Sequence, residues 1–280
     1  MKHNTKIKTY PNGLEKVTIC SRKLFSDSFE DNSREVPEQP FELVCKPKCM
    51  TNCSRQDSVI RARSKVFDIV AMNGFTHFVT LTISPEYHRD NPAVVRGLLR
   101  CFCSNRVQRD GLMYVLVPEY HKKGGAVHFH GFFKGGVDYA DSGTVLIPEK
   151  RKPVRQQTAK HYGVPPEQWQ TVYNIPKWIY GFSTAVELVG DVENVAKYIT
   201  KYVTKENTKI YGNFYFAGGK GLVREVPTSF CDVAQPHLVQ TEKQVYCDIL
   251  KCVFKYLDSS NDADREQLEL LGLCQPNEAR

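Results

Sequence analysis

The stretch Val127-His128-Phe129-His130-Gly131-Phe132-Phe133 places two histidines one residue apart inside an apolar, aromatic run. Because side chains alternate between the two faces of a β-strand, His128 and His130 are predicted on one face and Phe129 on the other. Two imidazoles at that spacing can share one divalent cation. The same pattern also suits two exposed strand histidines without a ligand, so the neighbouring sequence decides between these interpretations.

A second strand is predicted from Leu112 to Tyr120, and the basic turn Lys122-Lys123-Gly124-Gly125 leads from it into the histidine strand. Antiparallel pairing of the two strands would bring the Glu119 carboxylate close to both imidazoles. Such a mixed set of nitrogen and oxygen donors suits Mn²⁺ or Mg²⁺, although zinc would also bind. His121, on the same nominal face, is the competing third ligand, and Glu119 is preferred.

Helices and strands alternate on both sides of this hairpin. Periodicity, proline and Asn-Gly signals predict helices over 54–72, 91–107 and 192–205, and strands over 76–85, 178–188 and 211–216. Residues 134–177 are rich in Lys, Arg, Pro and Gln and are predicted to form a basic insertion with limited structure. The fold class expected is therefore α+β, with a central antiparallel sheet covered on one face by helices.

The two ends of the chain carry weaker patterns. Residues 1–53 contain scattered prolines and many charges, which indicates an irregular N-terminal arm that contains cysteines. Residues 226–280 are expected to form a helical C-terminal region, including a helix from His237 to Leu257, before an acidic tail. The chain is thus divided into an arm at 1–53, a central domain at 54–225 and a C-terminal region at 226–280.

Composition narrows the choice of partner. The formal net charge is +7, although the segment from Leu257 onward holds six acidic residues against two arginines, so the rest of the chain is still more basic. A basic body of this kind favours a polyanionic partner, nucleic acid before any other. No apolar run approaches the roughly 20 residues of a membrane span, so no membrane partner and a cytoplasmic location are expected.

Ten cysteines are many for a chain expected in a cytoplasm. Cys45, Cys49 and Cys53 follow one another at steps of four residues, with Cys20 upstream. A small structural zinc site is one interpretation, but neither gap is the usual C-x₂-C spacing. Reduced free thiols are the other interpretation.

The predicted helix 192–205 supplies a possible nucleophile. Tyr198 and Tyr202 are four residues apart, hence on one helical face and about 6 Å apart along the axis. Lys197, Lys201 and Lys205 repeat at the same interval on a neighbouring stripe. A basic helix with two half-buried tyrosines is the structural interpretation. A phenol near lysines and a metal can also attack a phosphodiester, provided that cations favour the phenolate.

Three segments in this order resemble a known family. They are Phe78-Val79-Thr80-Leu81-Thr82, then His128-Phe129-His130, then Tyr198-Ile199-Thr200-Lys201-Tyr202-Val203-Thr204-Lys205. Their order and spacing are similar to those of the HUH endonucleases, specifically the rolling-circle replication initiators (Rep proteins) of small single-stranded DNA phages and plasmids. Glu119 precedes the histidine strand where the family has its third metal ligand. The resemblance covers residues 76–205 and leaves both ends of the chain unexplained.

The resemblance implies a fold and a mechanism. The fold is a ferredoxin-like antiparallel sheet with the metal on its open face and the tyrosine helix beside it. Such an initiator nicks one strand at an origin, keeps the 5′ phosphate on Tyr198 or Tyr202 and later rejoins the strand. Lys201 or Lys205 would lie near the phosphate or the metal. The implied partners are single-stranded origin DNA, a host polymerase that extends the 3′-OH, and a host helicase. Gly218-Gly219-Lys220-Gly221 is no P-loop, so no helicase is fused to this sequence.

Three alternatives remain at this stage. A relaxase of the same superfamily usually carries its tyrosine before the histidines, whereas here the tyrosines follow them. A single-strand transposase of the superfamily is usually shorter. A non-catalytic nucleic-acid-binding module would explain the charge but not the combination of Glu119, His128, His130 and the tyrosines. The origin sequence, the physiological metal, the attacking tyrosine and the oligomeric state are not given by the sequence.

Overall fold

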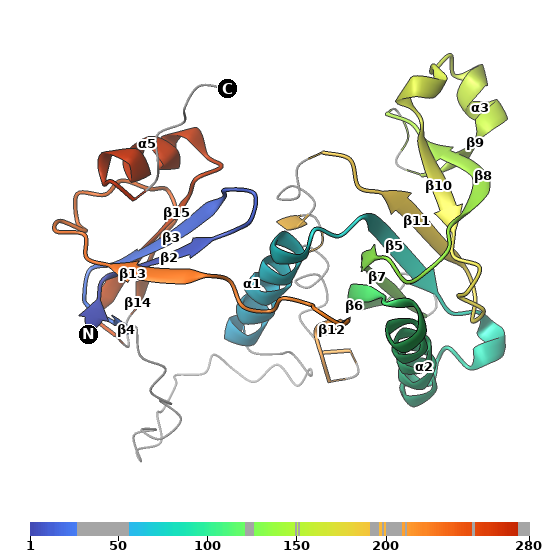
Figure 1. Cartoon of the computed structure of the whole chain (residues 1–280), viewed down its shortest axis with the longest axis horizontal. Helices are drawn as coiled ribbons and strands as arrows, with labels where there is room; N and C mark the ends of the chain where they lie inside the picture. The colour runs from blue at the N-terminus through green and yellow to red at the C-terminus, as the bar shows by residue number, and fades with distance from the viewer. Residues whose placement is uncertain are drawn as a thin grey trace, which may run out of the picture. The chain divides into compact units, whose positions relative to one another are not determined.

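The structure of the chain is a computed structural model (Figure 1). It describes residues 1–26, 56–120, 126–148, 150, 152–190, 196–197, 199, 209–210, 212–247 and 250–273. The chain divides into two compact units, one formed by Met1–Met50 with Glu225–Arg280 and the other by Thr51–Arg224. Each unit is described by itself below.

The unit Thr51–Arg224 contains the histidine strand. Its elements are α1 (Gln56–Asn73), β5 (His77–Thr82), the 3₁₀ helix η1 (Pro85–Tyr87), α2 (Pro92–Asp110), β6 (Met113–Tyr120), β7 (Val127–Lys134), β8 (Ala140–Leu146), β9 (Val154–Arg155), α3 (Gln156–His161), the 3₁₀ helix η2 (Pro166–Gln168), β10 (Gln170–Asn174), β11 (Ser183–Glu187) and β12 (Phe216–Gly218). The α+β class and the helices and strands predicted between 54 and 134 are confirmed.

One eight-stranded sheet organises this unit, in the order β12-β6-β7-β5-β11-β10-β8-β9. Every neighbouring pair is antiparallel, and β6 and β7 form the predicted hairpin. The histidine strand β7 therefore lies inside the sheet, between β6 and β5. A strand with two partners is held along both edges, which fixes the direction of its side chains.

Helix α2 covers one face of the sheet. Its apolar residues Val95, Leu99 and Phe102 pack with side chains from β5, β6 and β7, including Phe129 and Phe133. The helix begins where Asn91 accepts hydrogen bonds from two backbone N–H groups and Pro92 fixes the first turn. It ends at Gly111, whose φ of 72° is left-handed.

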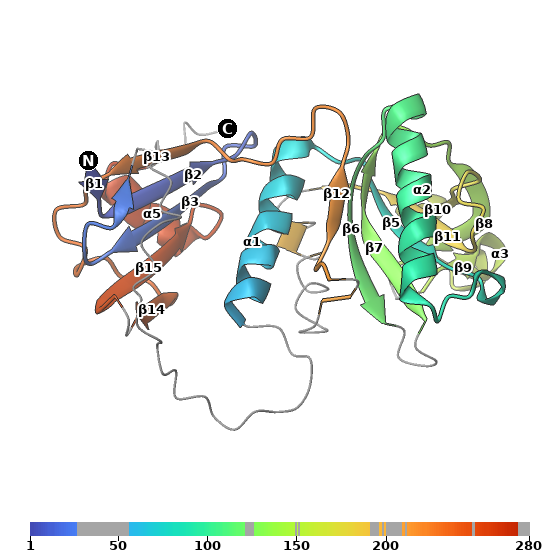
Figure 2. The same cartoon turned by 90° about the horizontal axis from the view of Figure 1, so that it is seen from below.

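Helix α1 lies on the opposite face (Figure 2). Phe75, just after α1, contacts Phe132, and Phe132 points away from the α2 face because it neighbours Phe133 along β7. In α1 the residues Val66, Phe67, Ile69 and Val70 are buried. Helices therefore lie on both faces, whereas the sequence predicted them on one.

The segment 134–177 is structured, which corrects the prediction of a loop with limited structure. It contributes β8, β9, α3, η2 and β10, and β8 and β10 pair antiparallel. A small core of its own forms around Val145, Ile147, Ala159 and Val164, with Trp169 packed against it. The Trp169 Nε1–H donates to the Val164 carbonyl at 2.9 Å. These apolar residues are spread thinly among charged ones, so their periodicity is hard to detect in sequence.

The second unit joins both ends of the chain. Its elements are β1 (Lys2–His3), β2 (Thr5–Thr9), β3 (Glu15–Cys20), β4 (Phe25–Ser26), β13 (Thr228–Cys231), β14 (Gln244–Cys247), β15 (Cys252–Asp258) and α5 (Asp262–Leu270). A five-stranded antiparallel sheet has the order β13-β2-β3-β15-β14, and β1 pairs with β4. Ile7, Val17, Ile19 and Leu257 form its core with Leu268 of α5.

Two predictions about the ends of the chain were therefore wrong within the described residues. Residues 1–26 are not an irregular arm but supply four strands. Residues 237–257 are not a helix, because β14 and most of β15 lie there, and only the short helix in the acidic tail (α5) is confirmed. The physical reason is that β2 and β3 pair with strands more than 200 residues away in sequence. Lys255 is buried in β15 because its Nζ donates to the carbonyls of His237 and Val239.

No helix among the described residues is long and apolar enough to cross a membrane.

Candidate functional site

The two histidines lie side by side on one face of the sheet. In β7, His128 is paired with Thr82 of β5 and Glu119 of β6, and His130 is paired with Thr80 and Val117. The imidazole centroids are 6.2 Å apart and the rings are nearly parallel. Residues that pair directly across a sheet share a face. The face that carries the histidines is therefore the one opposite α2, as the alternation with Phe129 predicted.

Two threonine hydroxyls orient the rings. The Oγ1 of Thr80 lies 3.0 Å from Nδ1 of His130, and the Oγ1 of Thr82 lies 2.8 Å from Nδ1 of His128. When each Nδ1–H donates to its threonine, Nε2 carries the lone pair of the ring. That tautomer is the one required of a metal-binding histidine whose other nitrogen is held by a neighbour.

Glu119 completes the cluster. Its Oε2 lies 3.2 Å from Nε2 of His130, and the carboxylate side chain is only 9% exposed. A buried carboxylate requires a cation or hydrogen-bond donors around it. The histidine strand and its hairpin partner thus bring Glu119, His128 and His130 together, as the sequence predicted.

The donor set fits a divalent cation by its chemistry. Two imidazole nitrogens and one carboxylate are ligands accepted by Mn²⁺, Mg²⁺ and Zn²⁺. Within the described ranges, however, no group of three His, Cys, Asp or Glu side chains is already arranged around a single point as a metal site. The direct contact between Glu119 and His130 accounts for this, because the carboxylate points at the nitrogen that would bind the ion. Ion binding requires the carboxylate to move off that nitrogen.

One comparison with known proteins bears on this region. Residues 76–207 match the family model described as Replication-associated protein, of the ORF2 type. This match indicates a replication initiator of the Rep type, and with it an interaction with DNA. Neither a curated protein nor a solved structure matches the chain. The match to the replication-associated family begins one residue before β5 and includes the whole histidine cluster.

The tyrosine segment also falls inside the part that matches the replication-associated family. Tyr198, Tyr202, Lys201 and Lys205 all lie outside the described residues. Among their neighbours, Ala196 and Ile199 are helical and fully buried. Residues three apart share a helical face, so one face of the predicted helix is apolar and covered. The roles of the two tyrosines and two lysines stay predictions.

Two other predictions also fall on residues that are not described. His121, the competing third ligand, is one of them. The proposed zinc ligands Cys45, Cys49 and Cys53 are the others. The site residues that the sequence missed are Thr80 and Thr82. Their signal was the alternation Thr80-Leu81-Thr82 in a strand next to the histidine strand, which puts both hydroxyls on one face.

Proposed function

We propose that this protein nicks and rejoins single-stranded DNA at a rolling-circle origin, with Tyr198 or Tyr202 as the nucleophile. The observation that carries the proposal is the cluster of Glu119, His128 and His130 on one sheet face, inside the region that matches the replication-associated family. The paired tyrosines follow this cluster in the same region. A binding module without catalysis would require none of these groups.

The reaction exchanges one phosphodiester for another. The phenolic oxygen attacks phosphorus, a tyrosine–phosphorus bond forms, and the bond from phosphorus to the 3′ oxygen breaks. The phenolic proton is lost to water or to a neighbouring base, and the departing 3′ oxygen takes up a proton. Because no bond is hydrolysed, a 3′-OH can attack the phosphotyrosine and rejoin the strand. Two tyrosines permit alternate cleavage and joining.

The chain's own residues hold the reacting groups. Thr80 and Thr82 fix the two imidazoles, which leaves Nε2 of each ring for a divalent cation together with Glu119. When bound, Mn²⁺ or Mg²⁺ supplies Lewis-acid stabilisation of charge on the scissile phosphate. Lys201 and Lys205 add positive charge beside the phenol and favour its ionised form. The partners in this proposal are origin DNA, a host helicase and a host polymerase, in the cytoplasm.

The test is capture of the covalent intermediate. A library of random single-stranded oligonucleotides carrying a 3′ label is incubated with the protein and Mn²⁺, and denatured protein is examined for label. The 5′ phosphate stays on the tyrosine, so a 3′ label should remain on the protein and a 5′ label should not. Sequencing of the captured strands then gives the origin.

Variants make this assay specific. Tyr198→Phe combined with Tyr202→Phe should abolish the adduct while DNA binding survives. Tyr162→Phe is the matched control, because Tyr162 is half exposed, lies in the same family match and is not part of the proposed site. An adduct that persists in the double variant would refute the nucleophile assignment.

A second function is favoured by the direct contact between Glu119 and His130. A carboxylate–imidazole pair that stays closed would make the cluster structural, and the protein a nucleic-acid-binding module. Titration with Mn²⁺ separates the two functions, because the structural cluster predicts the same Mn²⁺ affinity for wild type and for Glu119→Gln. A relaxase or single-strand transposase of the same superfamily would also give an adduct. The strands captured from the library distinguish these, since an initiator should select one origin sequence.

A further inference from the structure

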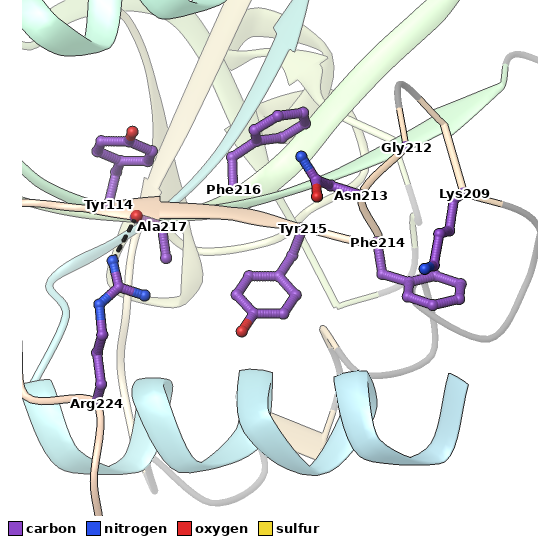
Figure 3. Close-up of a pocket in the computed structure, with 9 residues that line it drawn as sticks. All are labelled: Tyr114, Lys209, Gly212, Asn213, Phe214, Tyr215, Phe216, Ala217 and Arg224. Carbon is purple, nitrogen blue, oxygen red and sulfur yellow. Dashed lines mark hydrogen bonds between the residues drawn. The ribbon is translucent and has the colours of Figure 1, made fainter. Parts of the chain in front are cut away.

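A cleft beside the edge strand β12 is not used by the proposed nicking chemistry. Its volume is about 420 Å³, and it is lined mainly by the segment Lys209–Ala217 with Tyr114 and Arg224 (Figure 3). Pockets that hold small organic ligands begin at roughly 300 Å³. The cleft is therefore large enough for one nucleotide but not for a duplex.

The lining combines aromatic rings with positive charge. Nζ of Lys209 lies over the Phe214 ring, 5.5 Å from its centroid. Arg224 donates to the Ala217 carbonyl at 2.7 Å, which holds its guanidinium at the rim of the cleft. No carboxylate is among the nine residues that line the cleft. Aromatic faces next to Lys and Arg are the composition that binds successive bases and phosphates of a single strand.

The two sides of β12 differ. Tyr114 and Phe216 lie on one side, while the Tyr215 ring points to the side of α1 (Figure 3). Burial raises the pKa of the Tyr114 phenol to about 12, so this group stays neutral. The Phe216 ring packs against Phe129 of β7. On the far side, Tyr215 is the aromatic ring that remains to meet a ligand.

Strand register relates Tyr215 to the histidines. Phe216 pairs with Leu116, so residue 215 continues the pairing opposite Val117, and Val117 pairs with His130. These three positions share one face of the sheet. Two strand spacings separate Tyr215 from His130, or about 10 Å. A single strand whose phosphate lies at the histidine cluster can therefore reach this cleft with a neighbouring nucleotide.

We infer that the β12 cleft binds one nucleotide of single-stranded DNA, with its base stacked on Tyr215 and its phosphate beside Lys209 and Arg224. Its place next to the scissile phosphate rests on the proposed function. Stacking reads no sequence, because every base has an aromatic face. The cleft would hold the strand in position while the origin sequence is read elsewhere.

The experiment measures binding of a fluorescein-labelled oligothymidylate of fifteen residues by anisotropy, in EDTA, so that nicking cannot contribute. Tyr215→Ala should weaken binding about tenfold or more, and Tyr215→Trp should restore it. Lys209→Gln should lower the slope of log affinity against log salt by about 0.7, the value for one lost contact to a single strand. Lys209 is exposed, so this variant tests the inference even if Tyr215→Ala fails to fold.

Tyr162→Ala is the matched control. Its half-exposed ring also has a lysine over it, with Nζ of Lys150 4.5 Å from the centroid, but it lies outside the cleft. Equal losses for Tyr215→Ala and Tyr162→Ala, or no loss for Tyr215→Ala and Lys209→Gln, would overturn the inference. Competition by thymidine monophosphate as strong as by the oligonucleotide would also overturn it, since the cleft would then be a mononucleotide site.

The covalent assay keeps the two proposals apart. If no adduct forms but Tyr215→Ala still weakens binding to oligothymidylate, the nicking proposal fails and the cleft remains a single-strand site. If the adduct forms and Tyr215→Ala binds like wild type, the cleft fails and nicking stands.

Discussion

Gly131 should not accept a methyl group. It follows His130 in β7, and a Cβ built there would lie 1.9 Å from the Val115 carbonyl oxygen and 2.8 Å from Leu116 Cα. Both of these atoms belong to the backbone of β6, so no side chain can move aside. Ordinary contacts begin near 3.4 Å, and the two strands would have to separate by about 1.5 Å at this point.

The expected cost follows from that clash. Overpacking against a rigid neighbour costs about 1–3 kcal/mol, and the upper end applies because the hydrogen-bonded ladder itself must open. For a unit of this size, 3 kcal/mol lowers the melting temperature by roughly 6–12 °C. Because Glu119 and His130 lie on the two strands that separate, Gly131→Ala should also weaken Mn²⁺ binding.

Tryptophan fluorescence is the assay that isolates this unit. Both tryptophans of the chain, Trp169 and Trp178, lie within Thr51–Arg224. The matched control is Gly97→Ala, because Gly97 lies within α2 and a Cβ there meets nothing within 4 Å. That change should raise stability by about 1 kcal/mol. If Gly131→Ala melts at the wild-type temperature, the close approach of β6 and β7 is wrong, and with it the placement of Glu119.

Three further predictions test other contacts. Thr80→Val and Thr82→Val each remove a hydroxyl from an imidazole Nδ1 and should reduce Mn²⁺ affinity about 10- to 100-fold, measured by calorimetry, with little change in melting; unchanged affinity would contradict the orienting role. Burial lowers the pKa of His77 below 6.5, so its neutral form is favoured in the folded state and wild type should lose stability as pH falls below about 6.5; His77→Gln should lose less between pH 7 and pH 5 in thermal melts, and parallel curves would refute this. Lys255→Met leaves the carbonyls of His237 and Val239 without their donor and should destabilise the unit Met1–Met50 with Glu225–Arg280 by about 1–3 kcal/mol in urea unfolding, whereas an unchanged midpoint would show that these bonds carry no stability.

Local patterns predicted the central elements because their signals are short in range. Proline and asparagine at Asn91-Pro92 mark the start of α2, and Gly111 allows its end. The β6–β7 hairpin and the alternation in β7 put Glu119, His128 and His130 on one face, as the register shows. These arguments need only neighbours in sequence.

Long-range pairing was not predictable in the same way. The strands β2 and β3 find their partners in β13 and β15, at the other end of the chain. Period-two alternation in β15 is interrupted by the buried Lys255, whose partners are carbonyls that no pattern reveals. The β12 cleft was missed for a similar reason, since Tyr114 and Arg224 come together only through the pairing of β12 with β6.

The central claim is that a tyrosine attacks DNA with help from an ion held by Glu119, His128 and His130. The most direct measurement is mass-spectrometric mapping of the peptide that becomes linked to single-stranded DNA in Mn²⁺. The account predicts a phosphotyrosyl bond at Tyr198 or Tyr202 in wild type and none when His128 and His130 are both changed to alanine. A DNA adduct at any other residue, or one that forms equally well without the histidines, would contradict it.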